Sequence, residues 1–332
     1  MIFPAPAMNK CAKIRRNKDI HDLTVDDCME LRHPAPVAPL RLVALDIGGT
    51  KTHAVRYLGD QVVAEARTGS ANVQNVSVEQ AQQALREAFT ALGDEPVDLV
   101  IAGSGGIDTD ADELALSGLI ERFAPKAEVR IVHDTRLILA AGYAQTGIAV
   151  ILGTGSAIWG VNSFERTARY GGWGYLLGDE GAGYWFGREA VRHALDEFNR
   201  GQQRSVLTSL LLEHCGCEHR EELIALFHGQ TTREYWAQCA SVVFDAITAG
   251  DAAAEEILDR AATYVVASIS EVAKQLELTG PIVLGGGVIE HQRIYQQRLR
   301  AELGSAGFHD LRFLDQSPVY GVAFLAGLVG NT

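Results

Sequence analysis

Apolar and polar residues alternate along the chain from residue 41, in runs short enough for strands. Three such runs in succession predict a meander, with Gly59-Asp60 as a hairpin turn. A helix is predicted from Ser77, which with Gln80 fits a capping box ahead of an apolar stripe. Helices and strands then alternate, which predicts a mixed sheet with crossover helices. This half is expected to hold strands at 41–46, 52–58, 61–66, 98–102 and 128–132, and helices at 77–92, 112–123 and 134–145.

The same plan repeats from Ile148. A second apolar strand ends in a Gly-Thr-Gly-Ser turn and is followed by a return strand and a candidate third strand. The pattern then becomes helical, with a long amphipathic helix near 252–277, before a strand, a helix, a short strand and a last helix. The expected strands are 148–152, 157–161, 166–170, 281–284 and 311–314, with helices at 184–198 and 320–328.

Residues 1–39 differ from the rest of the chain. They carry a basic cluster and then Pro34, Pro36 and Pro39, with no sustained apolar period. We expect a disordered extension there. The remainder predicts a domain over 40–146, with the last helix at 320–330 as a candidate addition to it. A second domain is predicted over 147–319, with a helical insertion at about 184–280.

Composition narrows the function. The 332 residues suffice for two domains, and a formal charge of −13 argues against nucleic acid or an anionic membrane as partner. Five scattered cysteines do not form a disulfide framework, and no signal peptide is visible. The long uncharged span 137–164 is interrupted by a glycine turn, which argues against a membrane helix. We expect a cytoplasmic protein.

Three glycine turns follow apolar strands, at 48–49, 153–155 and 285–287. Glycines let a ligand approach the main chain, and a turn of exposed N–H groups is a plausible phosphate cradle. Thr50 and Thr52 add hydroxyls to the first turn, and Lys51 adds a positive charge. Neither a P-loop nor a dinucleotide-binding motif fits these spacings.

Acidic residues lie next to these turns in the sequence, and each allows a structural and a functional interpretation. Asp46, at a strand end, forms a turn or faces a metal-bound water, since Mg²⁺ prefers oxygen ligands. Asp134 is a helix N-cap or a base that accepts a proton from an attacking hydroxyl. Asp179 and Glu180, between glycines, are a solvated pair or acceptors for sugar hydroxyls.

The segment His214-Cys215-Gly216-Cys217-Glu218-His219 also has two readings. A structural metal site is one, although the spacing is tight for a single tetrahedral site and no second Cys/His pair stands nearby. The other is a loop between helices. The four tryptophans are expected in the core, with Trp173 as the main exception.

The turns, in this order, resemble those of the sugar kinase, actin and heat-shock chaperone superfamily. Asp46-Ile-Gly-Gly-Thr-Lys-Thr is similar to its first phosphate motif, Leu152-Gly-Thr-Gly-Ser to its second, and Gly285-Gly-Gly-Val to its adenosine motif. The block from Gly171 to Trp185 resembles the N-acetylglucosamine kinases, in the group of BadF-type ATPases. The resemblance implies an α/β fold of two actin-like (ribonuclease H-like) domains with mixed sheets and an ATP cleft between them.

The resemblance also implies roles for individual residues. Asp134 would be the catalytic base, and Asp46 would hold Mg²⁺ through water. Sugar contacts would come from Asn72, Asp134, Gly172, Trp173, Gly174 and Asp179. ATP contacts would come from Gly48, Gly49, Thr50, Lys51, Gly153, Thr154, Gly155, Ser156, Ala237, Gly285, Gly286 and Gly287. The tryptophan that follows the Ser-x-Asn segment in animal relatives is missing, so the outer sugar contacts are not carried over.

The function that the resemblance implies is transfer of the terminal phosphate of ATP, with Mg²⁺, to the 6-hydroxyl of N-acetylglucosamine. The alternatives are a glucosamine or other hexose kinase, and a BadF-type ATPase activator of a radical dehydratase or reductase. Such activators hold an iron–sulfur cluster through cysteines, for which Cys215 and Cys217 are the candidates. The resemblance further implies a homodimer.

Overall fold

The computed structural model describes residues 38–107, 109–229 and 232–330. Residues 1–40 and 41–332 are two separate units, and every element named below lies in the second. The disordered extension expected at 1–39 falls almost wholly outside the described residues. No helix in the described ranges combines the length and apolar character needed to cross a membrane.

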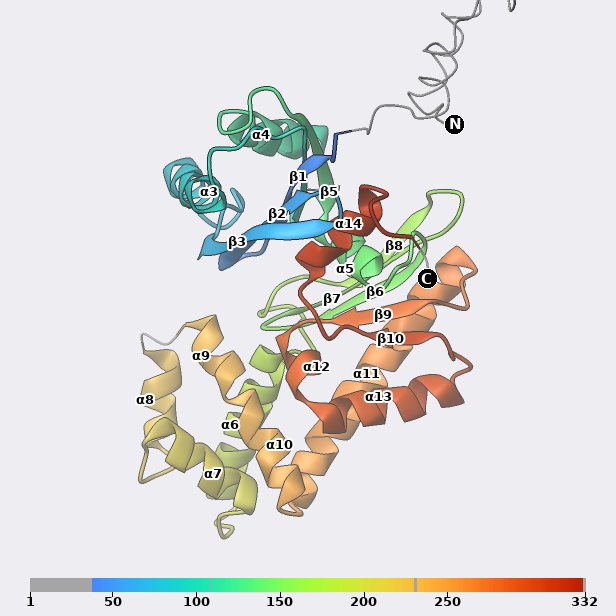
Figure 1. Ribbon diagram of the computed structural model, residues 1–332. Coiled ribbons are helices and arrows are strands. Elements are labelled where there is room, and N and C mark those ends of the chain that lie inside the picture. Colours follow the sequence, from blue (N-terminus) through green and yellow to red (C-terminus); the bar gives the residue numbers. More distant parts are fainter. Residues whose placement is uncertain (1–37, 108, 230–231, 331–332) are drawn as a thin grey trace, which may run out of the picture. The chain divides into compact units, whose positions relative to one another are not determined.

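The first sheet has five strands in the order β3-β2-β1-β4-β5 (Figure 1). Strands β1, β2 and β3 form the antiparallel meander expected from the sequence, whereas β4 and β5 run parallel to β1. Its strands are β1 (Arg41–Ile47), β2 (Lys51–Leu58), β3 (Gln61–Gly69), β4 (Leu99–Ser104) and β5 (Glu128–His133).

The second sheet repeats this plan, in the order β10-β9-β6-β7-β8. Its first three strands along the chain are antiparallel, and β9 and β10 are parallel additions on the other side of β6. Its strands are β6 (Gly147–Leu152), β7 (Ser156–Val161), β8 (Thr167–Gly171), β9 (Ile282–Gly285) and β10 (Leu311–Phe313). The repeat predicted from the sequence is therefore present.

The helices join and cover these sheets (Figure 1). Those of the first half are α3 (Val78–Leu92), α4 (Asp110–Ile120) and α5 (Asp134–Ala141). The helical region holds α6 (Gly183–Asn199), α7 (Val206–Cys215), α8 (Glu222–His228), α9 (Arg233–Gln238), α10 (Ala240–Thr248) and α11 (Ala252–Leu276). The last part holds α12 (Gly287–His291), α13 (Arg293–Ser305), the 3₁₀ helix η2 (Pro318–Gly321) and α14 (Val322–Leu325).

Local signals explain where these helices begin and end. Ser77 accepts a hydrogen bond from the Gln80 N–H while the Gln80 side chain bonds back, so α3 begins at the predicted capping box. α5 ends earlier than expected, at Ala141. Gly142 follows it, and Tyr143 takes a left-handed φ of 56°.

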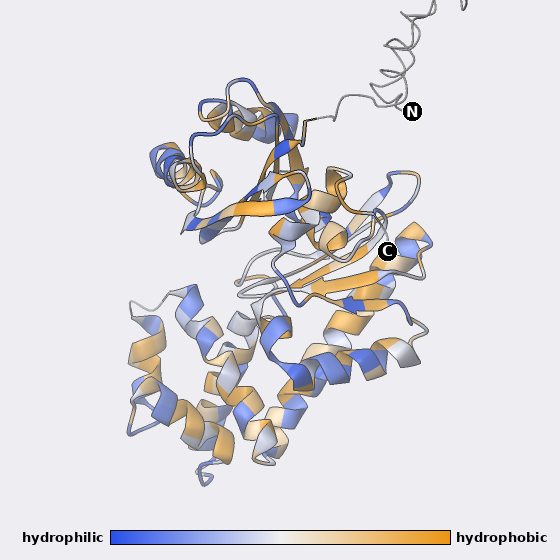
Figure 2. Cartoon of the chain, in the orientation of Figure 1, coloured by the Kyte–Doolittle hydropathy of each residue, from blue (hydrophilic) through white to orange (hydrophobic). Residues whose placement is uncertain are grey.

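Apolar cores form on these elements within the described residues. One lies between the first sheet and α3 and α4, and a larger one joins the second sheet to α6, α10, α11 and α13. A third contains α5 with β6 and β9. Figure 2 shows apolar residues concentrated in the strands of the second sheet and alternating with polar residues around the surrounding helices. Burial of these apolar faces is the main stabilising contribution.

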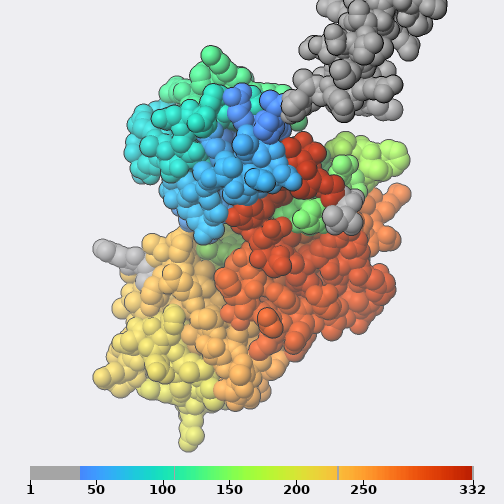
Figure 3. Space-filling view, in the orientation of Figure 1, coloured from blue at the N-terminus to red at the C-terminus, as the bar shows by residue number. Residues whose placement is uncertain are grey.

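Helix α5 and the C-terminal segment connect the halves. α5 contacts strands of both sheets, and η2 contacts β1, β2 and α5. Figure 3 shows the C-terminal segment, in red, lying against the blue surface of the first sheet. The domain boundaries near 146 and 319 stay predictions.

Candidate active site

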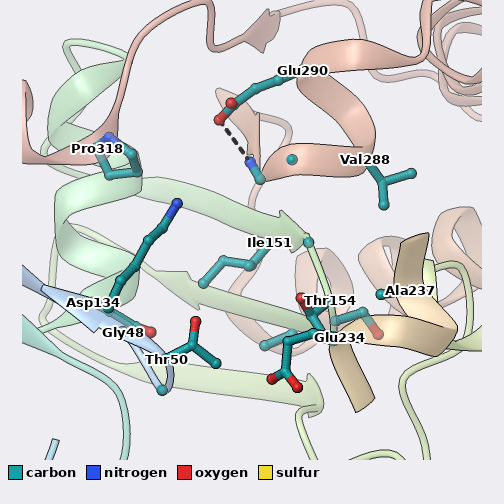
Figure 4. Close-up of a pocket in the computed structure, with 18 of the residues that line it drawn as sticks. Gly48, Thr50, Asp134, Ile151, Thr154, Glu234, Ala237, Val288, Glu290 and Pro318 are labelled. Carbon is teal, nitrogen blue, oxygen red and sulfur yellow. Dashed lines mark hydrogen bonds between the residues drawn. The ribbon is translucent and has the colours of Figure 1, made fainter. Parts of the chain in front are cut away.

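A cavity of about 1040 Å³ lies where the three glycine turns converge (Figure 4). The structure brings most of the residues singled out in the sequence to its wall. These are Asp46, Gly48, Gly49, Thr50, Lys51, Asp134, Gly153, Thr154, Gly155, Ser156, Gly172, Gly174, Asp179, Ala237, Gly286 and Gly287. Candidate phosphate, adenine-side and sugar residues therefore share one hollow.

Asn72, Trp173 and Gly285 do not line it. The buried Asn72 side chain donates a hydrogen bond to the carbonyl of Gly105, at 3.0 Å. Trp173 is 55% exposed, and the guanidinium of Arg169 lies 4.5 Å from its ring centre. Their assignment as sugar contacts, and that of Gly285 to ATP, stays a prediction.

The first turn joins β1 to β2. The Gly48 N–H donates to the Lys51 carbonyl, and Ser70 Oγ donates to the Gly48 carbonyl at 2.7 Å. Asp46 precedes this turn. Burial and then the charge of Asp134 raise the pKa of Asp46 to about 7, an effect that Lys51 opposes. A carboxylate in such surroundings is suited to a cation.

The second turn is locked to the glycine-rich block. The Ser156 N–H donates to Asp179 Oδ1 at 3.0 Å, and Ser156 Oγ donates to the Glu180 carbonyl. A Cβ on Gly155 would lie 2.8 Å from Asp179 Oδ2, so a larger residue here would displace that carboxylate. The Gly183 and Tyr184 N–H groups then donate to the carbonyls of Gly153 and Thr154.

Asp179 is the buried acid of this site. It is 3% exposed, and its φ of 65° is unusual for a residue with a side chain. Burial raises the pKa of its carboxyl group. Its Oδ2 has no hydrogen-bond partner among the described residues. A buried acceptor at a cavity wall needs a donor, which a ligand hydroxyl would supply.

The third turn closes the cavity opposite the first. Gly286 has a φ of 107°, and a Cβ there would lie 2.7 Å from the Leu152 carbonyl carbon, so only glycine fits. Its N–H donates to Glu290 Oε1 at 3.3 Å, the bond drawn in Figure 4. Ala237 and Val288 lie beside it in the same wall and are apolar.

Asp134 is the first residue of α5, but it is not the N-cap. His133 takes the N-cap position, and its Nδ1 lies 3.4 Å from the Thr135 backbone nitrogen. The Asp134 carboxylate therefore remains available to the cavity, with Oδ1 lying 3.0 Å from His133 Nδ1. The interpretation of Asp134 as the N-cap is wrong, because the residue before it occupies that position.

Sequence reasoning missed several residues in the wall. His53 and Arg67 come from β2 and β3, and Arg233 and Glu234 from α9. Residues 315–317 come from the segment before η2, and Pro318 is the first residue of η2. His53 is buried between Ser317 Oγ and Glu65 Oε1, each 2.8 Å from a ring nitrogen. Nothing in their local sequence marks them, because the fold brings them in.

The cysteine-containing segment at 214–219 forms the end of α7 and the turn after it. Gly216 has a left-handed φ of 66°, and the Cys217 N–H donates to the Leu212 carbonyl, as at an ordinary helix end. Within the described ranges, no group of three or more His, Cys, Asp or Glu side chains is arranged to hold a metal ion.

Comparison with known proteins adds to this geometry. A relative named N-acetylmuramic acid/N-acetylglucosamine kinase, from Clostridium acetobutylicum, is 30% identical over 262 residues, covering 75% of this chain and 86% of the relative. Another, named N-acetyl-D-glucosamine kinase, from Dictyostelium discoideum, is 27% identical over 79% of this chain and 89% of its own length.

A solved structure from Chromobacterium violaceum, whose name assigns it provisionally to the N-acetylglucosamine kinases, has a TM-score of 0.68. It is 26% identical, covering 86% of this chain and 98% of its own. The expected fold class, α/β with two actin-like domains and mixed sheets, is confirmed. The expected kinship is confirmed as well: residues 43–308 match the BadF/BadG/BcrA/BcrD ATPase family, and the chain belongs to that family.

Proposed function

We propose that this protein is an ATP-dependent sugar kinase that transfers the γ-phosphate of ATP to the 6-hydroxyl of N-acetylglucosamine. One observation carries the proposal. The Asp134 carboxylate lies in the wall of the same cavity as two Gly/Thr turns and Asp179 Oδ2, which has no hydrogen-bond partner among the described residues. A phosphate cradle, a base and a buried acceptor for a hydroxyl are the parts that phosphoryl transfer to a sugar requires.

ATP would bind across the turns. Backbone N–H groups of the first and second turns, with the hydroxyls of Thr50 and Thr154, would hold the phosphates, and Ser156 would lie beside them. The apolar side chains of Ala237 and Val288, beside the third turn, would face the adenine. Position 286 has to be glycine, since any side chain there would collide with the backbone of Leu152.

Asp46 and the carboxylates near it suit a magnesium ion that is held through water. Asp46 offers carboxylate oxygens, in surroundings where burial and two other carboxylates, Asp134 and Glu290, disfavour its charged form unless a cation is present. Mg²⁺ keeps several of its waters and needs only one or two protein carboxylates. When bound, it would neutralise phosphate charge as the γ-phosphoryl group is transferred.

The sugar would lie on the side of Asp134 and Asp179. Asp179 Oδ2 would accept a hydrogen bond from a sugar hydroxyl, and Gly172 and Gly174 would let the ring approach the backbone. Asp134 would accept the proton of the 6-hydroxyl as that oxygen attacks the γ-phosphorus. Asn72 and Trp173 stay in the proposal as contacts made when the sugar is bound.

The decisive experiment measures ADP release with Mg-ATP over a panel of sugars. The panel holds N-acetylglucosamine, N-acetylmannosamine, glucosamine and glucose, with N-acetylmuramic acid added because of the name of the Clostridium relative. We expect N-acetylglucosamine to have the highest kcat/KM. A preference for glucosamine or glucose would favour the hexose kinase alternative, and ADP release that ignores the sugar would contradict a kinase.

Two further expectations belong to this proposal. The protein is expected to be a cytoplasmic homodimer, and light scattering of the purified chain measures the oligomeric state. Iron in the purified protein would instead favour an ATPase activator of a radical dehydratase or reductase, with Cys215 and Cys217 as candidate ligands.

A further inference from the structure

The side chain of His133 lies directly beside the proposed base. Its Nδ1 is 3.0 Å from Asp134 Oδ1, and both side chains are half-buried. His133 is the last residue of β5 and the N-cap of α5. The strand end therefore delivers the imidazole and the carboxylate to the same place.

His133 is held on more than one side. Its Nδ1 lies 2.7 Å from Thr135 Oγ1 and 3.4 Å from the Thr135 N–H, and Thr135 is buried. The imidazole ring also stacks on Trp159 of β7, with an interplanar angle of 13° and ring centres 6.0 Å apart. Since β7 belongs to the second sheet, both halves of the protein fix this ring.

The second oxygen of Asp134 has a different neighbour. A Cβ on Gly105 would lie 2.9 Å from Asp134 Oδ2, so the main chain of the turn after β4 runs close to that oxygen. The same Gly105 accepts, through its carbonyl, the amide hydrogen bond of Asn72. Oδ1 thus faces an imidazole, and Oδ2 faces the backbone that Asn72 supports.

The neighbours of Nδ1 indicate where its proton lies. Two oxygens, Asp134 Oδ1 and Thr135 Oγ1, stand within 3.0 Å of it. The Thr135 N–H also points at Nδ1, but at 3.4 Å it is the longest of the three contacts and beyond the usual hydrogen-bond length. A proton on Nδ1 gives the carboxylate a donor, whereas an unprotonated Nδ1 would set its lone pair against the carboxylate. A hydrogen bond to an ionised oxygen is also roughly twice as strong as one between neutral groups.

We propose that His133 is a positioning residue for the base: its Nδ1–H donates to Asp134 Oδ1 and leaves Oδ2 to accept the proton of the attacking hydroxyl. This inference rests on the proposed kinase function. His133 itself touches no reacting atom. It sets the rotation of the carboxylate, and a small misplacement of a reacting group lowers rates by about a hundredfold.

Three substitutions separate positioning from helix capping. Asn places an N–H where Nδ1 stood and is a good N-cap. Ser is an equally good cap, but its shorter side chain does not reach Oδ1 as a donor, and Gln places its amide near the position of Nε2. We expect His133→Asn to keep kcat within about tenfold, while His133→Ser and His133→Gln lower it by about a hundredfold at unchanged sugar KM.

If the serine and asparagine variants are equally active, His133 acts only as a helix cap and the proposal is overturned. A hundredfold loss in the asparagine variant, with wild-type thermal stability, would also overturn it. Thermal melting of each variant, followed by circular dichroism, shows which variants fold, and kinetic constants are compared only among those.

A measurement without turnover keeps the hydrogen bond testable on its own. The ¹⁵N chemical shifts of the imidazole in wild-type protein, assigned by their absence in His133→Asn, report which nitrogen carries the proton. We expect the chemical shift of Nδ1 to be that of a protonated nitrogen and to change in Asp134→Asn. The shift of an unprotonated Nδ1 in wild-type protein would overturn the proposal. Wild-type protein that releases no ADP with any sugar would defeat the kinase function instead, whatever the spectrum shows.

Discussion

His53 Nδ1 and Ser317 Oγ are 2.8 Å apart although 264 positions separate them in the chain. The contact ties β2 of the first sheet to the segment that enters η2. His53 Nε2 lies 2.8 Å from Glu65 Oε1, and Tyr320 donates to the other oxygen of Glu65. The C-terminal segment is therefore hydrogen-bonded to the first sheet along one wall of the cavity.

This network predicts a pH dependence of stability. Burial lowers the pKa of His53 below its ordinary value near 6.5, against the opposing effect of Glu65. The unfolded chain then binds the proton more readily, so the free energy of unfolding decreases as pH falls below about 6.5 until the lowered pKa is passed. The slope for one proton is at most about 1.4 kcal/mol per pH unit.

Urea unfolding of wild type and His53→Gln between pH 5 and 8 measures this effect. We expect the difference between the two proteins to shrink as pH falls. The variant His309→Gln, at an exposed position before β10, keeps His53 and should retain the wild-type slope. Parallel curves for wild type and His53→Gln would contradict the prediction.

The network also shows what sequence reasoning could and could not reach. The glycine turns are predictable because a strand, a turn and a returning strand form a local pattern in the sequence. His53 carries no such signal, since a polar residue in an alternating strand is ordinary. Its partner Ser317 reaches it only because the chain returns to the first sheet after β10. The sequence makes the last helix a candidate addition to the first domain, but no local pattern indicates which side chains then meet.

Asp134 marks the boundary between the two cases. Its position after a strand and before a helix suits both a catalytic base and an N-cap, so the residues alone leave both interpretations open. Only the geometry shows that His133 caps the helix. Resemblance points to Ala237, whereas nothing in the sequence points to Arg233 and Glu234 on the same short helix.

Replacing the proposed base should separate binding from transfer. We expect Asp134→Asn to lower kcat by about 10²–10⁴-fold, because it removes the acceptor of the hydroxyl proton. Sugar binding, measured by calorimetry, should remain within a few-fold of wild type, since the amide keeps the shape of the carboxylate. Asp60→Asn, in the exposed β2–β3 turn, is the matched control and should change neither quantity. Near-normal turnover in Asp134→Asn would show that another group is the base.

The two charged residues of the first turn, Asp46 and Lys51, should differ in their importance for activity. Lys51 is exposed, whereas Asp46 lies among carboxylates at the end of β1. If Asp46 holds Mg²⁺ through water, Asp46→Ala should raise the Mg²⁺ concentration for half-maximal activity by about tenfold or more, roughly the effect of losing one charge-assisted contact. Lys51→Ala should raise the KM for ATP by less and leave the Mg²⁺ requirement in place. Chelation of Mg²⁺ should abolish the activity of both variants. A larger loss of activity in Lys51→Ala than in Asp46→Ala would contradict the assignment of Asp46 to Mg²⁺.

Gly155 offers a steric test of the sugar side. In Gly155→Ala the new methyl group would lie 2.8 and 3.0 Å from the two oxygens of Asp179, too close for that carboxylate to stay hydrogen-bonded to Ser156. Hydrogen bonds to charged groups contribute about 1.5–3 kcal/mol, so we expect the sugar KM to rise by roughly tenfold to a hundredfold.

Gly304→Ala is the matched control, because nothing lies within 4 Å of a Cβ at that position in α13. It should leave the kinetics unchanged and raise stability by about 0.5–1 kcal/mol, since alanine favours a helix over glycine. A normal sugar KM in Gly155→Ala would mean that Asp179 can move without affecting the sugar, and would remove it from the site. A rise in the KM for ATP alone would instead place the 153–156 turn in phosphate binding without its link to Asp179.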